Sequence, residues 1–195
     1  MGVPTIKTGP MTVEEFYAFA DARPDEEKWE LIDGEPVLNA SPTPIHQWIV
    51  GNLMLALRSR AREFHASWAA FPGLGVRVSD INRPEPDVLV IPRAGSSLAK
   101  FWRDRNDIIL AFEVLSPSTQ DRDLRWKRAA YTSIPSLTHY VVIAQDAIDV
   151  VVFARDFGFA ERRIRSLEES LDLPSLGISV PLSEIYDDIE WIRAR

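Results

Sequence analysis

The sequence contains no cysteine among its 195 residues. This absence excludes disulfide bonds and metal sites built on thiolates, and it fits a reducing compartment. The sequence also lacks any run of about 18 consecutive apolar residues, so we expect no transmembrane helix. The opening residues, MGVPTIKTGPMTVEEF, lack the positively charged start and apolar core of a secretory signal. We therefore expect a cytoplasmic protein that has no membrane partner.

Positive charge is scarce. Lys and Arg total 22 against 29 Asp and Glu, which gives a net charge of −7. This balance argues against a protein that coats nucleic acid through bulk charge. It excludes neither a local basic groove nor a nuclease, because acids that bind a metal cation also push the balance negative. Lysine is the rarer base and occurs only at Lys7, Lys28, Lys100 and Lys127.

Apolar residues are abundant enough for a sizeable core, since the chain is 46% hydrophobic with six Trp and nine Phe. Its length favours one domain, and no repeat or linker is visible. We expect a single domain over residues 1–195, with a core at about 11–166 and a covering segment at 167–195.

Local patterns predict mixed secondary structure. A Thr followed three residues later by Glu predicts a capped helix over 11–23. An Asp-Gly pair between apolar residues predicts a hairpin over 29–38, and apolar residues at helical spacing predict a helix over 45–64. A further helix is expected over 121–133 and a short one at 182–187. Short apolar or β-branched stretches predict strands near 67–71, 74–78, 86–91, 107–115, 139–143, 149–155 and 160–166. The order predicts an α/β (α+β-like) fold with a mixed sheet flanked by helices.

Two carboxylates interrupt buried strands: Asp87 begins PDVLVI, and Glu113 lies within IILAFEVL. Removing water from a charge costs several kcal/mol unless a partner compensates. If the two strands are neighbours, the two like charges need a cation or a shared proton, and magnesium suits carboxylate ligands. In the alternative interpretation, each acid simply pairs with an arginine.

Lys127 is the lysine that follows the two candidate acids in the sequence. Strand side chains alternate, so Leu115 faces the same way as Glu113, and a cation at that position would lie beside the acid. The next helix instead carries Lys127, with Asp123 four residues before it and Tyr131 one turn after it. Lys127 either forms a weak surface pair with Asp123 or leans over the strand end towards the acids.

Several motifs together carry a family resemblance. They are PDVLV, EVLSPST and a D-x-x-x-K helix with a following Tyr, accompanied by MTVEEF, ELIDGE, SPTPIH and IPSLTHYVVIAQD. In this order and spacing they resemble the Uma-two family of restriction-endonuclease-like proteins, within the PD-(D/E)XK nuclease superfamily. The resemblance covers residues 11–152. It implies a restriction-endonuclease-like mixed sheet and a magnesium-dependent hydrolase that cleaves phosphodiester bonds in DNA.

The resemblance also implies roles for individual residues. Asp87 matches the PD acid and Glu113 the (D/E) acid, and together they would hold Mg²⁺, with Mn²⁺ as a substitute. The lysine of the superfamily would fall at Leu115, so the motif departs from its usual form there. Lys127 matches the lysine that the Uma-two pattern places on the following helix, where it would assist the attacking water.

Two further residues match the family pattern. Glu30 in ELIDGE matches an acid that would be an extra metal ligand, and His46 matches a histidine that would contact a metal-bound water or a phosphate. The alternatives are a polar residue on a hairpin face for Glu30, and a histidine bonded to backbone at a helix start for His46.

The expected partner is nucleic acid, with DNA favoured. Two basic clusters are candidates for phosphate contacts, although a solvated charged face is the alternative for most of them: Arg58, Arg60, Arg62, Arg122, Arg125 and Arg128. The superfamily also suggests a homodimer. Two alternative functions remain: a nuclease-fold binding or regulatory protein that no longer cuts, and an enzyme acting on RNA or a branched junction.

Overall fold

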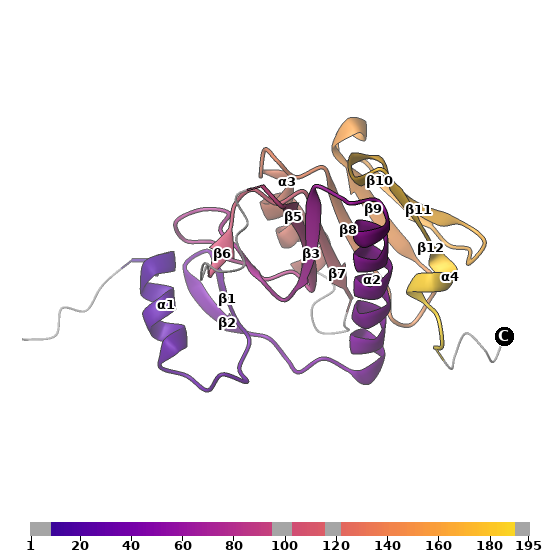
Figure 1. Cartoon of the computed structure of the whole chain (residues 1–195). Coiled ribbons are helices and arrows are strands. Elements are labelled where there is room, and N and C mark those ends of the chain that lie inside the picture. The colour runs from indigo at the N-terminus through magenta and orange to yellow at the C-terminus, as the bar shows by residue number, and fades with distance from the viewer. Residues whose placement is uncertain (1–8, 95–102, 116–121, 190–195) are drawn as a thin grey trace, which may run out of the picture.

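The protein is described by a computed structural model over residues 9–94, 103–115 and 122–189. In these residues the chain forms a central six-stranded sheet with helices on both faces (Figure 1). From one edge to the other, the strands are β10 (Glu161–Ile164), β9 (Val150–Ala154), β8 (His139–Ile143), β7 (Leu110–Val114), β5 (Val88–Pro92) and β3 (Trp68–Pro72). Within this sheet β7 and β8 run parallel and the other neighbours antiparallel, so the predicted mixed sheet is confirmed.

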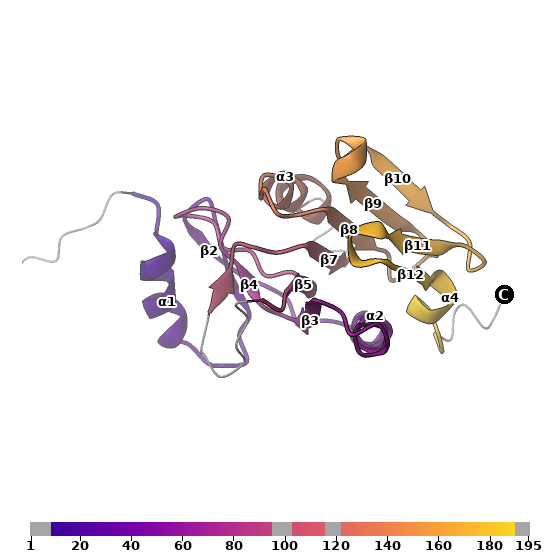
Figure 2. The same cartoon turned by 45° about the horizontal axis from the view of Figure 1, so that its top comes forward.

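The two faces of the sheet are covered by different helices. Helix α2 (Pro44–Glu63) packs on the face that carries Val88 and Val90, and α3 (Arg128–Thr132) packs on the opposite face with Leu89. Figure 2 shows the two helices on opposite sides of the sheet. Because both faces are covered, the central strands are continuous apolar runs rather than alternating ones.

The N-terminal part follows its local sequence signals. Helix α1 (Val13–Asp21) begins at the expected capping box, where the Thr12 hydroxyl accepts from the Glu15 N–H and the Glu15 carboxylate accepts from the Thr12 N–H. Strands β1 (Trp29–Ile32) and β2 (Glu35–Leu38) form the expected hairpin. Asp33 and Gly34 have φ of 50° and 77°, as a tight Asp-Gly turn requires.

Gly34 is the position in this hairpin where a side chain cannot be accepted. A Cβ there would lie 2.2 Å from the Pro10 Cβ, and φ is in the left-handed region. We expect Gly34→Ala to lower the free energy of unfolding by about 1–3 kcal/mol, measured by urea denaturation. Gly51→Ala is the matched control, because nothing lies within 4 Å of its Cβ position in α2. It should raise stability by about 0.5–1 kcal/mol, and equal stability of the two variants would contradict this account.

The C-terminal segment contains more structure than the sequence indicated. A hairpin of β11 (Ser170–Leu173) and β12 (Ile178–Pro181) was expected only as a covering segment, and η3 (Pro174–Leu176) connects its strands. The short helix expected at 182–187 is present as α4 (Leu182–Ile185). These elements bury their apolar residues in the same core as α2. This contact explains why the segment is ordered despite its few local signals.

Two other expectations changed in detail. The helix expected over 121–133 is a π-helical stretch, η1 (Arg122–Lys127), followed by α3, and residue 121 lies outside the described residues. The strand expected at 74–78 is the two-residue β4 (Gly75–Val76), which pairs with β6 (Asp104–Arg105), and η2 (Arg155–Phe157) follows β9. In the described ranges, no helix combines the length and the apolar character needed to cross a membrane.

Candidate active site

Asp87 and Glu113 lie at the same end of the sheet. Strands β5 and β7 are antiparallel with Val88 opposite Phe112, so the residue before Val88 adjoins the residue after Phe112. The Asp87 Oδ2 accepts a hydrogen bond of 2.7 Å from the Val114 N–H. This bond fixes the Asp87 carboxylate against the end of β7, next to Glu113.

His46 contacts Asp87 from α2. Its ring Nε2 lies 3.1 Å from the Asp87 Oδ1. The histidine is placed there because α2 begins at this point: Thr43 caps the helix and accepts from the His46 N–H at 3.1 Å. The ring is buried, and its Nδ1 has no hydrogen-bond partner among the described residues. The contact through Nε2 therefore joins α2 to the acid end of the sheet.

The charge on Asp87 is stabilised despite its burial. Burial raises the pKa of this carboxyl, but the hydrogen bond and charge of His46, the Val114 N–H and the Lys127 ammonium together outweigh that effect. The pKa of Asp87 is therefore lowered below its ordinary value. Asp87 is a carboxylate at neutral pH, the form that binds a metal or a proton donor.

Lys127 is buried between two acids. Its Nζ lies 2.7 Å from the Glu113 Oε1 and 3.0 Å from the Glu30 Oε1. The side chains are almost fully enclosed, with 3% of Lys127, 3% of Glu113 and 0% of Glu30 exposed. In this setting one ammonium faces two carboxylates, and Asp87 adds a third acid close by. Two buried acids beside one amine are a setting in which either a further cation or a shared proton balances the negative charge.

Glu30 reaches this cluster from the N-terminal hairpin. Its Oε1 accepts a hydrogen bond of 2.7 Å from the Glu85 N–H. The segment that carries Glu85 is attached to β1 through Leu31 and Arg83, which exchange backbone hydrogen bonds of 3.2 and 2.8 Å. Glu30 is thus held by backbone on one side and faces Lys127 on the other.

Tyr131 is a member of the cluster that the sequence did not assign to the site. Its hydroxyl donates to the Glu113 Oε1 at 3.2 Å. Burial raises the pKa of Tyr131 well above its ordinary value, and the nearby carboxylates of Glu113 and Glu30 raise it further. The hydroxyl therefore stays protonated and donates to Glu113. The available signal was its spacing, four residues after Lys127 on the same helical face.

The lysine is supplied by a π-helical turn rather than by strand β7. Leu115 continues the sheet pairing through its N–H to the Ile143 carbonyl at 2.8 Å and packs among apolar residues. Lys127 ends η1, just where the chain continues as α3. Single π-helical turns are frequent at functional sites. This one directs Lys127 back over the end of β7.

The structure brings the five residues singled out from the sequence into two contacting groups. One is His46 with Asp87, and the other is Glu30, Glu113 and Lys127. Among the described contacts, Glu113 contacts Lys127, Glu30 is buried, and the His46 ring contacts the Asp87 carboxylate. The side chain of Asp123 lies outside the described residues.

The donor set fits magnesium. In the described part of the chain, no three His, Asp or Glu side chains form a ready-made metal site. Magnesium does not require one, since it is held through one or two carboxylates together with water and substrate phosphates. Asp87 and Glu113 supply carboxylate oxygens of this kind at one end of the sheet.

Comparison with known families identifies the relatives of this chain. Residues 13–183 match the Uma2 family, whose description is "Putative restriction endonuclease".

The chain belongs to the Uma2 family.

The resemblance drawn from the sequence motifs is thereby confirmed. A solved structure agrees with this Uma2 assignment at the level of fold. It is the crystal structure of "a putative nuclease belonging to DUF820" from Anabaena variabilis, with a TM-score of 0.75 and 16% identity. The match covers 91% of this chain and 98% of that one. The fold is therefore restriction-endonuclease-like. A comparison with curated proteins finds no match.

Proposed function

We propose that this Uma2 protein is a metal-dependent endonuclease that hydrolyses phosphodiester bonds in DNA. The observation that carries the proposal is the contact of buried Lys127 with Glu113, beside Asp87 at one end of the central sheet. Two acids that can hold a metal ion and an adjacent amine are groups that can support phosphodiester hydrolysis. The nuclease-like family and fold support the same reaction class.

Asp87 and Glu113 would hold the metal, and Mg²⁺ or Mn²⁺ are the expected ions. When bound, the ion supplies Lewis-acid polarisation of the phosphate and lowers the pKa of a water. His46 and the Val114 N–H orient the Asp87 carboxylate, and Tyr131 orients that of Glu113. Glu30 positions Lys127, and a further role for Glu30 as a metal ligand remains a prediction.

Lys127 acts on the attacking water and on the phosphate. The oxygen of the water attacks the phosphorus and the water gives up one proton to solvent. The phosphorus–oxygen bond to one nucleotide breaks, and the released oxygen takes up a proton from solvent. The Lys127 amine orients the water and offsets the negative charge that develops on the phosphate. Contacts with two carboxylates keep this amine at a defined position.

A second candidate function is a nuclease-fold binding or regulatory protein that does not cut. One observation favours it: the Glu113 Oε1 already accepts hydrogen bonds from Lys127 and Tyr131. A metal ion would have to share this carboxylate with both donors. A cleavage assay separates the two functions.

The purified protein is expected to nick or cut DNA in Mg²⁺ or Mn²⁺ and to lose this activity in EDTA. The assay compares supercoiled plasmid, linear duplex, single-stranded DNA and RNA, resolved on gels over time. A Glu113→Gln preparation, purified in parallel, reveals any contaminating nuclease. Cleavage that survives EDTA would refute the metal requirement. A folded protein that cuts none of these substrates with either ion would favour the binding or regulatory function.

A further inference from the structure

A basic pocket lies between α2 and the edge strand β3. It encloses about 320 Å³. Its lining is Arg58, Ala61, Arg62, Ala69, Ala70, Phe71, Pro72 and Arg93. Three of these residues are arginines, and none of the described residues that line the pocket is acidic. In a chain with a net charge of −7, this is a local concentration of positive charge.

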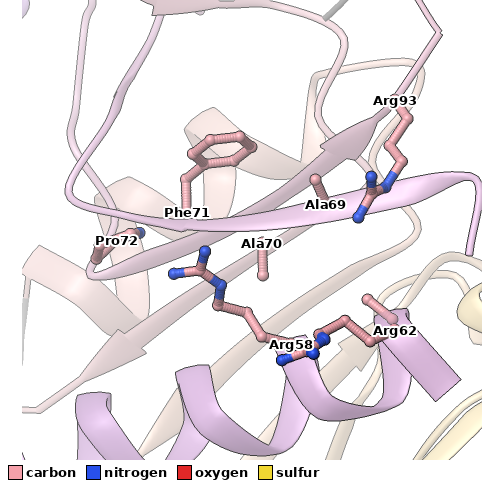
Figure 3. Close-up of a pocket in the computed structure, with 8 residues that line it drawn as sticks. Arg58, Arg62, Ala69, Ala70, Phe71, Pro72 and Arg93 are labelled. Atoms are coloured by element: carbon pink, nitrogen blue, oxygen red, sulfur yellow. The ribbon is translucent and has the colours of Figure 1, made fainter. Parts of the chain in front are cut away.

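The arginines converge on the pocket from two elements. Arg58 and Arg62 are four residues apart and share one face of α2, and Arg93 follows β5. Figure 3 shows Arg58 extending from α2 towards β3, Arg62 lying beside it, and Arg93 reaching towards Ala69. In the described part of the chain, none of the three forms an ion pair with an acid.

Arg60, on the same helix, differs from Arg58 and Arg62 because its side chain binds other parts of the protein. It points away from the pocket and binds Glu184 through two hydrogen bonds of 2.8 and 2.9 Å. It also donates to the Ser179 carbonyl at 2.9 Å. Arg60 thus ties α2 to the C-terminal segment, whereas Arg58 and Arg62 have no comparable acid partner among the described residues.

The edge strand leaves room for a ligand. Strand β3 ends the sheet, so one side of its backbone has no neighbouring strand among the described residues. Ala70 faces α2 and carries only a methyl group, so its side chain takes up little of the space between β3 and α2. The result is a hollow with an apolar floor and guanidinium groups above it, a combination that suits an anion with an attached organic chain.

One end of the pocket lining, at Pro72, adjoins the end of β5 that carries Asp87. Pro72 pairs with Val88, and the Gly73 N–H donates to the Asp87 carbonyl at 3.1 Å. From Pro72 to Ala69 the strand spans about 10 Å. Along one nucleic-acid strand this equals roughly three nucleotides at 3.4 Å each. The α2 positions of Arg58 and Arg62 lie roughly 18 and 24 Å along the helix from His46.

We infer that this pocket binds the phosphate backbone of a nucleic-acid strand that extends from the candidate active site. The inference rests on the proposed function, since it assigns the pocket to the substrate of that site. Guanidinium groups bind phosphate oxygens through two parallel hydrogen bonds. Contacts with Arg58, Arg62 and Arg93 hold the strand away from the scissile bond and set its direction without reading its sequence.

Two other uses of the arginines predict different results. Charge along an edge strand prevents pairing with a second molecule, in which case removing it promotes aggregation and leaves DNA affinity unchanged. A pocket for an acidic peptide would bind polyglutamate as well as it binds DNA of similar charge. The three arginines of the lining and the ability of guanidinium groups to bind phosphate oxygens through two parallel hydrogen bonds favour the phosphate backbone.

The test compares two variants that each lose two positive charges. Arg58→Gln/Arg62→Gln removes exposed arginines of the pocket, and Arg162→Gln/Arg165→Gln removes exposed arginines at the opposite edge of the sheet. Arg93 is left in place because its Nε also binds the Trp68 carbonyl at 3.0 Å. Affinity for a labelled DNA duplex is measured by fluorescence anisotropy in EDTA over a range of salt concentrations, so that cleavage has no influence.

We expect Arg58→Gln/Arg62→Gln to weaken binding by roughly tenfold or more and to reduce the slope of log affinity against log salt by about 1.8, or about 0.9 for each of two phosphates. The control pair should leave both values nearly unchanged, and Arg58→Lys/Arg62→Lys should keep most of the slope. The inference would be overturned if the two Gln pairs had equal effects or if the Kd were unaffected. It would also be overturned if polyglutamate of equal charge competed with DNA, or if the parent protein did not bind DNA. Because binding is measured without cleavage, an unaffected Kd in a protein that still cuts DNA leaves the proposed function standing.

Discussion

Replacing Lys127 by methionine is expected to lower the free energy of unfolding by about 3–5 kcal/mol. The methionine fills a similar volume but removes the ammonium that lies 2.7 Å from Glu113 and 3.0 Å from Glu30. Two buried carboxylates then face each other without their cation, and breaking a buried ion pair from one side leaves an uncompensated charge. Urea denaturation at neutral pH, with equal m-values for both proteins, measures the loss.

A double variant separates the charge effect from packing. Glu30→Gln in the Lys127→Met background removes one of the uncompensated charges, so part of the lost stability should return. The matched control is Lys28→Met, because Lys28 is exposed, and it should change stability by no more than about 0.5 kcal/mol. A loss below about 1 kcal/mol for Lys127→Met would mean that the lysine is not the charge partner of the two acids. The proposed role of Lys127 further predicts that the variant cuts DNA much more slowly even under conditions where it is folded.

The central sheet was predictable because its strands carry strong local signals. The stretches around Val88, Phe112 and Val141 are short, apolar and β-branched or aromatic, and all lie on central strands. The hairpin of residues 170–181 was not predicted, since its strands alternate buried and exposed residues over only four positions each. Its order depends on packing against α2, a contact between segments more than a hundred residues apart in the chain.

The candidate site was predictable as a set of residues but not as a set of contacts. An acid within an apolar strand stands out, and this identified Asp87 and Glu113. The sequence suggested a metal as a partner of Glu113, which stays a prediction, and it did not predict the hydrogen bonds that this carboxylate accepts from Lys127 and Tyr131. The prediction placed Lys127 and Tyr131 on a regular helix. In the structure a π-helical turn, which no local sequence pattern predicts, sets the direction of the Lys127 side chain.

The arginines of α2 illustrate the same limit. In the sequence LRSRAREF, nothing distinguishes Arg58, Arg60 and Arg62 from one another. Helical geometry separates them, because residues four apart share a face and residues two apart do not. Only the fold reveals that Glu184 lies on one side and an open sheet edge on the other. The basic pattern of α2 therefore supports a functional hypothesis only after the fold shows in which direction each arginine side chain points.

An Asp87→Asn variant is expected to lose DNA cleavage by a factor on the order of 10³ while keeping its fold. The amide oxygen can still accept from the Val114 N–H, so the end of β5 keeps its hydrogen bond. The variant lacks the negative charge with which Asp87 would bind a metal. Initial cleavage rates of plasmid DNA in Mg²⁺, at protein concentrations above those needed for the parent, measure the effect.

Stability against pH gives this variant a second readout that does not depend on cleavage. The folded-state pKa of Asp87 is lowered, so its carboxylate stabilises the fold above the pKa of the unfolded chain and loses that effect as pH falls through the folded pKa. In EDTA, Asp87→Asn should therefore be less stable than the parent at neutral pH and should approach it in acid. Asp172→Asn, an exposed change on β11, should match the parent in both cleavage and pH dependence. An Asp87→Asn protein that cuts within several-fold of the parent rate would place the metal site elsewhere. One that also keeps the parent's neutral-pH stability would show that the His46 contact contributes little to the charge on Asp87.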